Sequence, residues 1–121
     1  MIYNDLTLRY FEDTPGAGVL TGPHVFRGSA GRRIDGAWVQ FDVRVDSGVV
    51  EAVRFLAFAC PHTIAASAWV AEHGVGPLSQ AVLPETVQEL SDRFAVPVEK
   101  RGRLLVIEDA WVAALSAVLK R

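Results

Sequence analysis

Cys60 is the side chain best placed to do chemistry, and it is the only cysteine among the 121 residues. It follows an apolar run typical of a strand and precedes Pro61, which suits the first turn of a helix. Backbone N–H groups and the helix dipole at such a junction favour a thiolate, as in reactive and metal-ligating cysteines. The alternative is a buried cysteine that packs as a small apolar side chain. A single cysteine excludes a disulfide within the chain, which fits a reducing compartment.

His62 lies two residues after Cys60, and a Cys-x-His spacing is found in metal-ligand pairs. Two donors do not complete a tetrahedral site, and the other histidines, His24 and His73, are distant in sequence. A metal site made by this chain alone is therefore not the favoured interpretation. The alternative is that His62 is an exposed residue in the first helical turn.

The acidic side chains do not form a recognisable catalytic pair. Glu12-Asp13 and Glu108-Asp109 fit helix ends or solvated faces, and the segment Arg32-Arg33-Ile34-Asp35 contains one possible ion pair and no motif. The sequence contains no GxGxxG, P-loop, nucleophile elbow or HExxH motif. We therefore do not expect an enzyme, and a small enzyme with Cys60 as its nucleophile is the remaining catalytic hypothesis.

The length and composition indicate a single compact domain. Because the sequence lacks catalytic motifs, we expect this domain to work by contacting other proteins. Half of the residues are apolar and the formal net charge is −2, with no basic stripe that would indicate nucleic-acid binding. The length is close to the commonest domain size, so we expect a single domain over residues 1–121. The longest strongly apolar stretch, 110–119, is far shorter than the roughly 18 residues of a membrane span. The N-terminus lacks the pattern of a signal peptide, so we expect a cytoplasmic protein.

A strict alternation of apolar and polar residues predicts a half-buried strand over 38–45. Residues 46–48 form a tight connection, and 49–59 is predicted to return as the second strand of a hairpin. One face of this second strand carries Val49, Val53, Phe55 and Ala57, and the other carries Val50, Arg54, Leu56 and Phe58. The second face is apolar near its end, so we expect a helix to cover it. A third, short strand is predicted at 24–26, followed by a loop.

Helices are predicted at both ends of the chain. Asn4 or Asp5 caps a first helix, with Leu6, Leu8, Tyr10 and Phe11 on its apolar side, which stops at 14–18. Further helices are predicted at 62–72, 84–94 and 104–119, with 95–98 extended. The last helix should bury Trp111 and Leu115. Strands followed by helices imply an α+β fold with an antiparallel sheet of about three strands and helices on one face.

Residues 48–68 resemble the centre of the U-type iron–sulfur cluster scaffold family, which includes IscU and the N-terminal domain of NifU. Members of that family carry a strand of the form G-x-[IV]-x-[DE]-[AV]-x-[FW] that ends in Gly-Cys. A helix of small residues containing A-x-A-S-x-S follows the strand. Gly48 begins the match here, and Cys60 falls on the family's second cluster cysteine.

The resemblance extends to both ends of the chain in the same order. Residues 10–18 resemble the family segment H-[YF]-x-N-P-x-N-x-G, and 108–110 match the acidic part of C-S-x-L-A-E-D-A-[IL]. The segment 96–100 falls where bacterial scaffolds carry L-P-P-V-K, which the dedicated Hsp70-type chaperone binds. The resemblance therefore implies a partner-binding segment that includes Val96, Pro97 and Lys100. It also implies a cysteine desulfurase as a second partner.

Several positions depart from the family's ligand set. Asp35 stands in place of the first cysteine, and Ala37 replaces the aspartate that tunes cluster lability. Arg103 stands in place of the third cysteine, with Gly102 where many members have histidine. A cluster normally takes four thiolates or close substitutes, and a guanidinium cannot ligate a metal.

The resemblance implies a cofactor site of Cys60, Asp35 and His62, with Cys60 and Asp35 as metal ligands. The implied cofactor is iron or a labile iron–sulfur cluster, and the ligand count leads us to expect none that is tightly bound. We further expect Cys60, Asp35 and Arg103 to lie together at one end of the domain, with Arg103 contacting Asp35.

Two functional hypotheses follow from the resemblance. The first is a divergent scaffold-like protein of iron–sulfur cluster biogenesis, which bridges a cluster or iron between two chains or carries a persulfide on Cys60. The second is an adaptor or regulator that keeps the scaffold's partner surfaces but binds no cluster.

Overall fold

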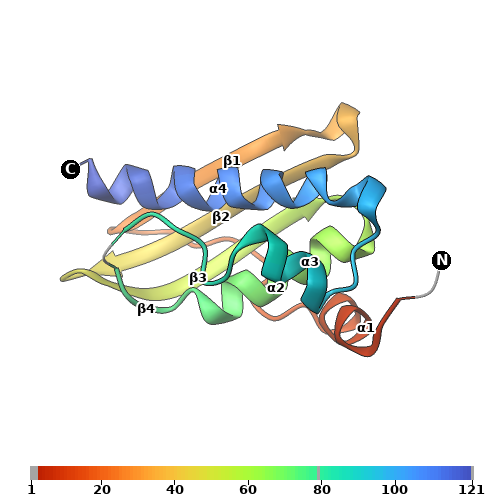
Figure 1. The fold of residues 1–121 in the computed structure, drawn as a ribbon. Helices are drawn as coiled ribbons and strands as arrows, with labels where there is room; N and C mark the ends of the chain where they lie inside the picture. The colour runs from red at the N-terminus through yellow and green to blue at the C-terminus, as the bar shows by residue number, and fades with distance from the viewer. Residues whose placement is uncertain (1–2, 79, 121) are drawn as a thin grey trace.

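The computed structural model describes residues 3–78 and 80–120 of the chain. The elements in order are α1 (Asp5–Glu12), β1 (Val25–Arg32), η1 (Arg33–Asp35), β2 (Ala37–Asp46), β3 (Val49–Phe58), α2 (Pro61–His73), β4 (Gly76–Pro77), α3 (Val87–Arg93), η2 (Val98–Lys100) and α4 (Gly102–Leu119). The strands form a four-stranded antiparallel sheet in the order β1-β2-β3-β4. Helices α2 and α4 lie on one face of this sheet (Figure 1). The α+β architecture is confirmed, and β4, of only two residues, adds a strand to the three expected.

The hairpin of β2 and β3 is confirmed, with Trp38 opposite Phe58 at one end. Its connection, Ser47-Gly48, has positive φ at both residues, as in tight hairpin turns. The register shifts between Arg44 and Val45. Because of this shift, Val50 is 2% exposed while Val49 is 40% exposed, so the predicted faces of β3 are wrong at this end.

Strand β1 is longer than the predicted 24–26, and its glycines explain the difference. Gly28 is buried directly beneath α4, where an added Cβ would lie 2.1 Å from the backbone nitrogen of Ala114. The glycine therefore allows the close approach of helix and strand. Read from sequence alone, Gly28 and Gly31 indicate a loop.

The core lies between the sheet and the helices. Val39, Phe41 and Val43 of β2 have no exposed surface. The ring of Trp111 from α4 packs edge-on against Phe41, with centroids 5.3 Å apart. Trp111 and Leu115 are each 2% exposed, which confirms the predicted buried stripe.

The opposite face of the sheet is covered over only part of its length. The segment 17–24 crosses it, and the backbone N–H of Leu20 donates to Oδ2 of the buried Asp42 at 3.0 Å. Arg27 donates to the same carboxylate from β1. Beyond this crossing, Leu56 and Phe58 are 37% and 53% exposed. The expectation that a helix covers this end of β3 is therefore wrong.

The helices differ from expectation in detail. The side chain of Asn4 caps α1, but Leu8 and Phe11 are exposed, and it is Tyr10 that is buried. Helix α3 begins only at Val87, because Thr86 and Glu89 form a capping box there. The end of the predicted extended segment is the 3-10 helix η2. In residues 3–78 and 80–120, no helix is both long and apolar enough to cross a bilayer.

Candidate functional site

Three segments meet at one end of the domain: the end of β3 with Cys60, the β1–β2 hairpin tip, and the start of α4 (Figure 1). The guanidinium of Arg103 lies beside the tip, because a Cβ added at Gly36 would be 3.9 Å from its Nη2. Arg103 also lies near enough to the side chain of Cys60 to help lower the pKa of its thiol. The structure thus brings Cys60 and Arg103 together, with Asp35 in the adjacent tip.

Cys60 is half-buried and occupies the N-cap position of α2, where its side chain makes no capping hydrogen bond. Its Sγ lies 3.4 Å from Oγ1 of the buried Thr63. Burial by itself raises the pKa of the Cys60 thiol. Hydrogen bonds with the hydroxyl and main chain of Thr63, the charge of Lys100 and the hydrogen bond from Arg103 outweigh that effect, so the pKa is lowered from its ordinary value. A thiol with a lowered pKa is a better nucleophile at neutral pH.

Asp35 pairs with a neighbour in its own hairpin. Arg32 donates to both carboxylate oxygens, from Nε at 2.9 Å and from Nη2 at 3.3 Å. Both side chains are more than half exposed. The contact that we expected between Asp35 and Arg103 is therefore replaced by a local ion pair within the tip.

His62 is 1% exposed, so its interpretation as an exposed first-turn residue is wrong. Its ring packs against Tyr3 with centroids 4.8 Å apart. Its Nδ1 has no hydrogen-bond partner among the residues described. Burial, and then the charge of Lys100, lower the pKa of His62, so the ring is neutral at pH 7.

The donor set does not fit an iron–sulfur cluster held by one chain. Within the described ranges, no three His, Cys, Asp or Glu side chains gather where they could hold a metal ion. Cys60 supplies the one thiolate, Asp35 is engaged by Arg32, and Arg103 places a fixed cation beside the sulfur.

The segment expected to bind a chaperone is only partly accessible. Val96 is 5% exposed and belongs to the core, whereas Val98 is 74% exposed on η2. Pro97 is half-buried, and so is Lys100, which acts electrostatically on both Cys60 and His62. A partner that binds this segment would contact the exposed Val98, whereas Val96 is buried.

The sequence alone did not identify Thr63 and Arg33 as residues of the candidate site. Thr63 stands three residues after the cap residue Cys60, the spacing at which a side chain reaches the capping position. Arg33 lies with its guanidinium carbon 5.0 Å from the ring centroid of Trp38. No pattern in the sequence indicates that second contact, since it depends on how the hairpin tip folds.

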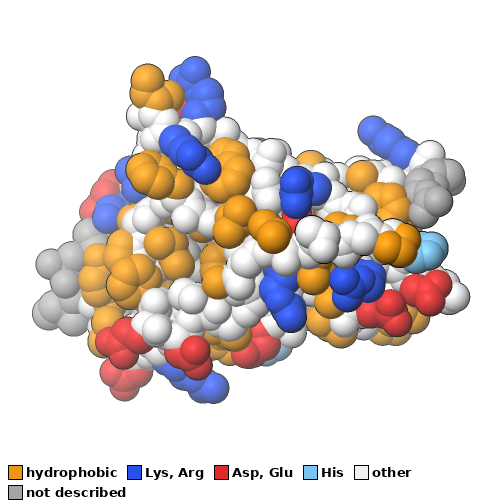
Figure 2. All heavy atoms as spheres, turned by 180° about the vertical axis from the view of Figure 1, so that it is seen from behind, with side chains coloured by type: hydrophobic (Ala, Val, Ile, Leu, Met, Phe, Trp, Pro, Cys, Tyr) orange, Lys and Arg blue, Asp and Glu red, His pale blue; other side chains and the backbone are white. Residues whose placement is uncertain are grey.

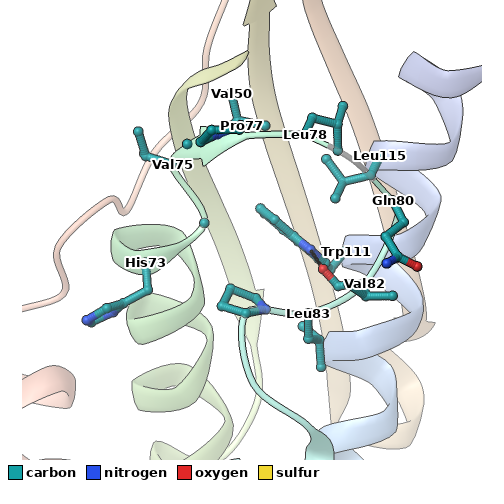
Figure 3. A pocket seen from close by; sticks show the side chains of 13 residues that line it. Val50, His73, Val75, Pro77, Leu78, Gln80, Val82, Leu83, Trp111 and Leu115 are labelled. Carbon is teal, nitrogen blue, oxygen red and sulfur yellow. Dashed lines mark hydrogen bonds between the residues drawn. The ribbon is translucent and has the colours of Figure 1, made fainter. Parts of the chain in front are cut away.

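A cavity of about 230 Å³ lies at the other end of the domain (Figure 3). The end of α2, β4, the following loop and α4 line it, and Trp111 donates from Nε1 to the carbonyl of Val82 at 2.8 Å on its wall. The side chain of His73 points away from it (Figure 3). Neither Cys60 nor His62 lines this cavity, so it is separate from the cysteine site.

Comparison with solved structures shows which proteins share this fold. The structure is similar to the N-terminal part of a NifU-like protein from Brucella abortus, at 16% identity and a TM-score of 0.69, over 98% of this chain and 94% of that one. It is also similar to a protein of Fervidobacterium islandicum AW-1 described as an iron–sulfur cluster assembly scaffold for the SUF system. That similarity has 14% identity and a TM-score of 0.70, over 93% of this chain and 96% of that one. Identities this low show the shared fold alone. No protein of the curated set matched the sequence.

The sequence itself carries the family assignment. The family model described as the NifU-like N terminal domain matches residues 2–121. The chain therefore belongs to the NifU-like N-terminal domain family.

Proposed function

We propose that this chain is a divergent scaffold-like protein of iron–sulfur cluster assembly that accepts sulfur on Cys60 and acts through contacts with other assembly proteins. Family membership over residues 2–121 supports the pathway, as does the fold shared with a scaffold described for the SUF system. The proposal assigns the chain no catalytic cycle of its own. We expect it to act as one domain, in the cytoplasm, a reducing compartment that suits a free thiol.

The observation that carries the proposal is the pairing of a single activated thiol with two cations. The pKa of Cys60 is lowered despite burial, and Arg103 and Lys100 lie within electrostatic reach of Sγ. A thiolate there can attack the outer sulfur of a persulfide on a donor protein. The donor's sulfur–sulfur bond breaks, its cysteine leaves as a thiolate, and Cys60 keeps the outer sulfur as a persulfide anion. The same two cations would stabilise that anion.

A whole cluster is a poorer cargo for the same residues. One thiolate, a carboxylate already paired with Arg32 and a neutral buried histidine do not make a cluster ligand set. Iron or a labile cluster would need a second chain or a partner to supply ligands. The adaptor hypothesis is the second candidate, because Arg103 and the Asp35–Arg32 pair occupy positions where the family has cluster ligands. An adaptor would need only the surfaces that contact partner proteins.

The test is sulfur transfer from a cysteine desulfurase supplied with cysteine, followed by intact-mass measurement of this chain. We expect an added mass of one sulfur atom, which a thiol reductant removes, and none in Cys60→Ser. A chain that binds the desulfurase but never gains sulfur would replace this proposal with the adaptor.

A further inference from the structure

The cavity beside β4 and α4 has a floor of core side chains and an exposed rim. Val50, Trp111 and Leu115 line it and are each 2% exposed. Val75 and Val82 also line it and are 52% and 56% exposed, so the cavity opens to solvent on their side. Its volume is about 230 Å³. Protein interiors hold few voids larger than a water molecule, so a space of this size requires an explanation.

The walls of the cavity are held in place by contacts of their own. Nε1 of Trp111 donates to the carbonyl of Val82 at 2.8 Å, which fixes the indole ring against the rim. A Cβ added at Gly74 would lie 2.4 Å from Cη2 of the same ring, so the ring packs directly on the backbone at the end of α2. On another wall, the N–H of Leu78 donates to the carbonyl of Gly48 at 2.8 Å, beside the pairing of β4 with β3. A cavity that is already formed in this way is typical of small-molecule sites.

The chemistry of the lining favours an uncharged ligand. The described residues that line the cavity include no Asp, Glu, Lys or Arg. The side chain of His73 points away from the cavity (Figure 3), and its Nδ1 lies 2.9 Å from the carbonyl oxygen of Trp69. An ion in the cavity would lose water without gaining a charged partner. Gln80 contributes a side-chain amide to the lining, which suits a single polar group on the ligand.

The size of the cavity and its aromatic wall narrow the class of ligand further. An apolar cavity of about 150 Å³ holds one benzene ring. The cavity here is larger, at about 230 Å³, which suits a bicyclic molecule. An aromatic ligand would meet the ring of Trp111, and aromatic pairs are stabilised beyond the burial of their area.

A second apolar surface lies on the opposite face of the sheet from α2 and α4. Seen from behind, apolar side chains gather on that side of the molecule (Figure 2). Phe58 is 53% exposed there and stands two residues before Cys60, so this surface adjoins the site already described. Neither residue lines the cavity. The cavity is therefore the apolar feature that sulfur transfer does not explain.

We infer that the cavity binds a small, uncharged, bicyclic aromatic molecule. This inference goes beyond the proposed function and does not depend on it, because the cavity lies at the far end of the domain from Cys60. A chain that gains sulfur on Cys60 but binds no aromatic probe would lose this inference alone.

The test titrates the isotope-labelled full chain with indole and follows its N–H resonances by NMR. We expect a saturable shift at the side-chain N–H of Trp111 and the amide of Leu83, which line the cavity, and none at Trp38, opposite Phe58. Indoleacetate should bind about tenfold more weakly or worse, because its carboxylate loses water and finds no cation. A shift that does not saturate, or equal affinity for the two probes, would overturn the inference.

Val82→Phe places a larger side chain at the exposed rim of the cavity, where it should leave the fold intact. It should weaken indole binding about tenfold or more, because added bulk takes the space of the ligand. Val98→Phe is the matched control, since Val98 is 74% exposed on η2 and does not line the cavity. Unchanged affinity in Val82→Phe would contradict the inference.

The remaining outcomes are also decisive. Should Val82→Phe fail to fold, the comparison of indole with indoleacetate decides alone. If the resonances of Trp111 and Leu83 move when the wild type is concentrated without indole, a second copy of the chain occupies the cavity and the inference is overturned.

Discussion

Arg103, at the start of α4, acts on the thiol of Cys60, at the start of α2, and helps to lower its pKa. The resemblance to U-type scaffolds leads one to expect a second thiolate at the position of Arg103. The substitution changes what the site can do, because a cation stabilises a thiolate or persulfide anion and repels a metal ion.

Replacing Arg103 by leucine should raise the pKa of Cys60, because one of the groups that lower it is lost. Less thiolate would then be present at neutral pH, and alkylation by iodoacetamide should slow. The pH dependence of the alkylation rate measures this, with Arg101→Leu as the control on an exposed neighbour. Equal midpoints for Arg103→Leu and wild type would show that Arg103 does not act on the thiol.

Gly28→Ala should destabilise the fold by about 1–3 kcal/mol, as overpacking of a core does. Its Cβ would lie 2.1 Å from the nitrogen of Ala114, so α4 must move away from β1. Gly102→Ala is the matched control, because no heavy atom lies within 4 Å of its added Cβ. Urea denaturation followed by circular dichroism gives both values. Equal free energies of unfolding for the two variants would contradict the close packing of α4 on β1.

The same glycine shows how far the sequence predicts this fold. The β2–β3 hairpin was predictable, because the alternation of apolar and polar residues indicates a half-buried strand. Strand β1 was not predictable, because a glycine in a sequence usually indicates a loop. Gly28 instead allows close packing against Ala114 of α4, nearly ninety positions away in the sequence. The faces of β3 were mistaken at Val49 and Val50, because a β-bulge leaves no mark in an apolar run.

The candidate site was predictable only in part. Cys60 was found from its strand-to-helix junction, and Arg103 from the resemblance. The partner of Asp35 was not, because the choice between Arg32 and Arg103 depends on the shape of the hairpin tip. The burial of His62 was also hidden, since it depends on Tyr3 packing over the start of α2.

Asp42 should make the stability of the domain sensitive to acid. Burial alone raises its pKa, but hydrogen bonds from Arg27 and the N–H of Leu20, and the charge of Arg27, outweigh it and lower the pKa below the ordinary 3.8. A group with a depressed pKa stabilises the fold above its ordinary pKa, and that contribution is lost as pH falls through the folded value. Wild-type stability should therefore fall between pH 5 and pH 3, values chosen to bracket about 3.9 for free aspartate.

Asp42→Ala tests this assignment. It should cost about 1–3 kcal/mol at pH 7, because the N–H of Leu20 loses its acceptor, and its acid dependence should be weaker. The exposed Asp46→Ala is the control and should change little. If the free energies of unfolding of the wild type and Asp42→Ala fall equally with pH, Asp42 is not the cause of the acid sensitivity.

His62 should add a second loss of stability at milder acidity. Burial and the charge of Lys100 lower its pKa from the ordinary 6.5, so protonation favours the unfolded chain. Its contribution is present above pH 6.5 and is lost as pH falls through the folded pKa. His62→Phe should flatten the stability between pH 7 and pH 5.5, values chosen around about 6.5 for free histidine. His24→Asn, at an exposed position, should not. An unchanged slope in His62→Phe would show that the pKa of His62 does not differ between the folded and unfolded chains.

The ligand set predicts how the protein responds to iron and sulfide. Anaerobic reconstitution of the wild type should retain far less than one stable cluster per chain, measured by iron content and visible absorbance. Cys60 is the one thiolate, and Arg103 is a cation beside it. Asp35→Cys combined with Arg103→Cys should raise cluster retention, because it adds two thiolates at the end of the domain where Cys60 lies. The double variant Asp35→Ser with Arg103→Ser is the matched control, since it removes the same groups without adding sulfur. A strongly coloured wild type whose colour disappears in Cys60→Ser would contradict this prediction and show that the chain holds a cluster as it stands.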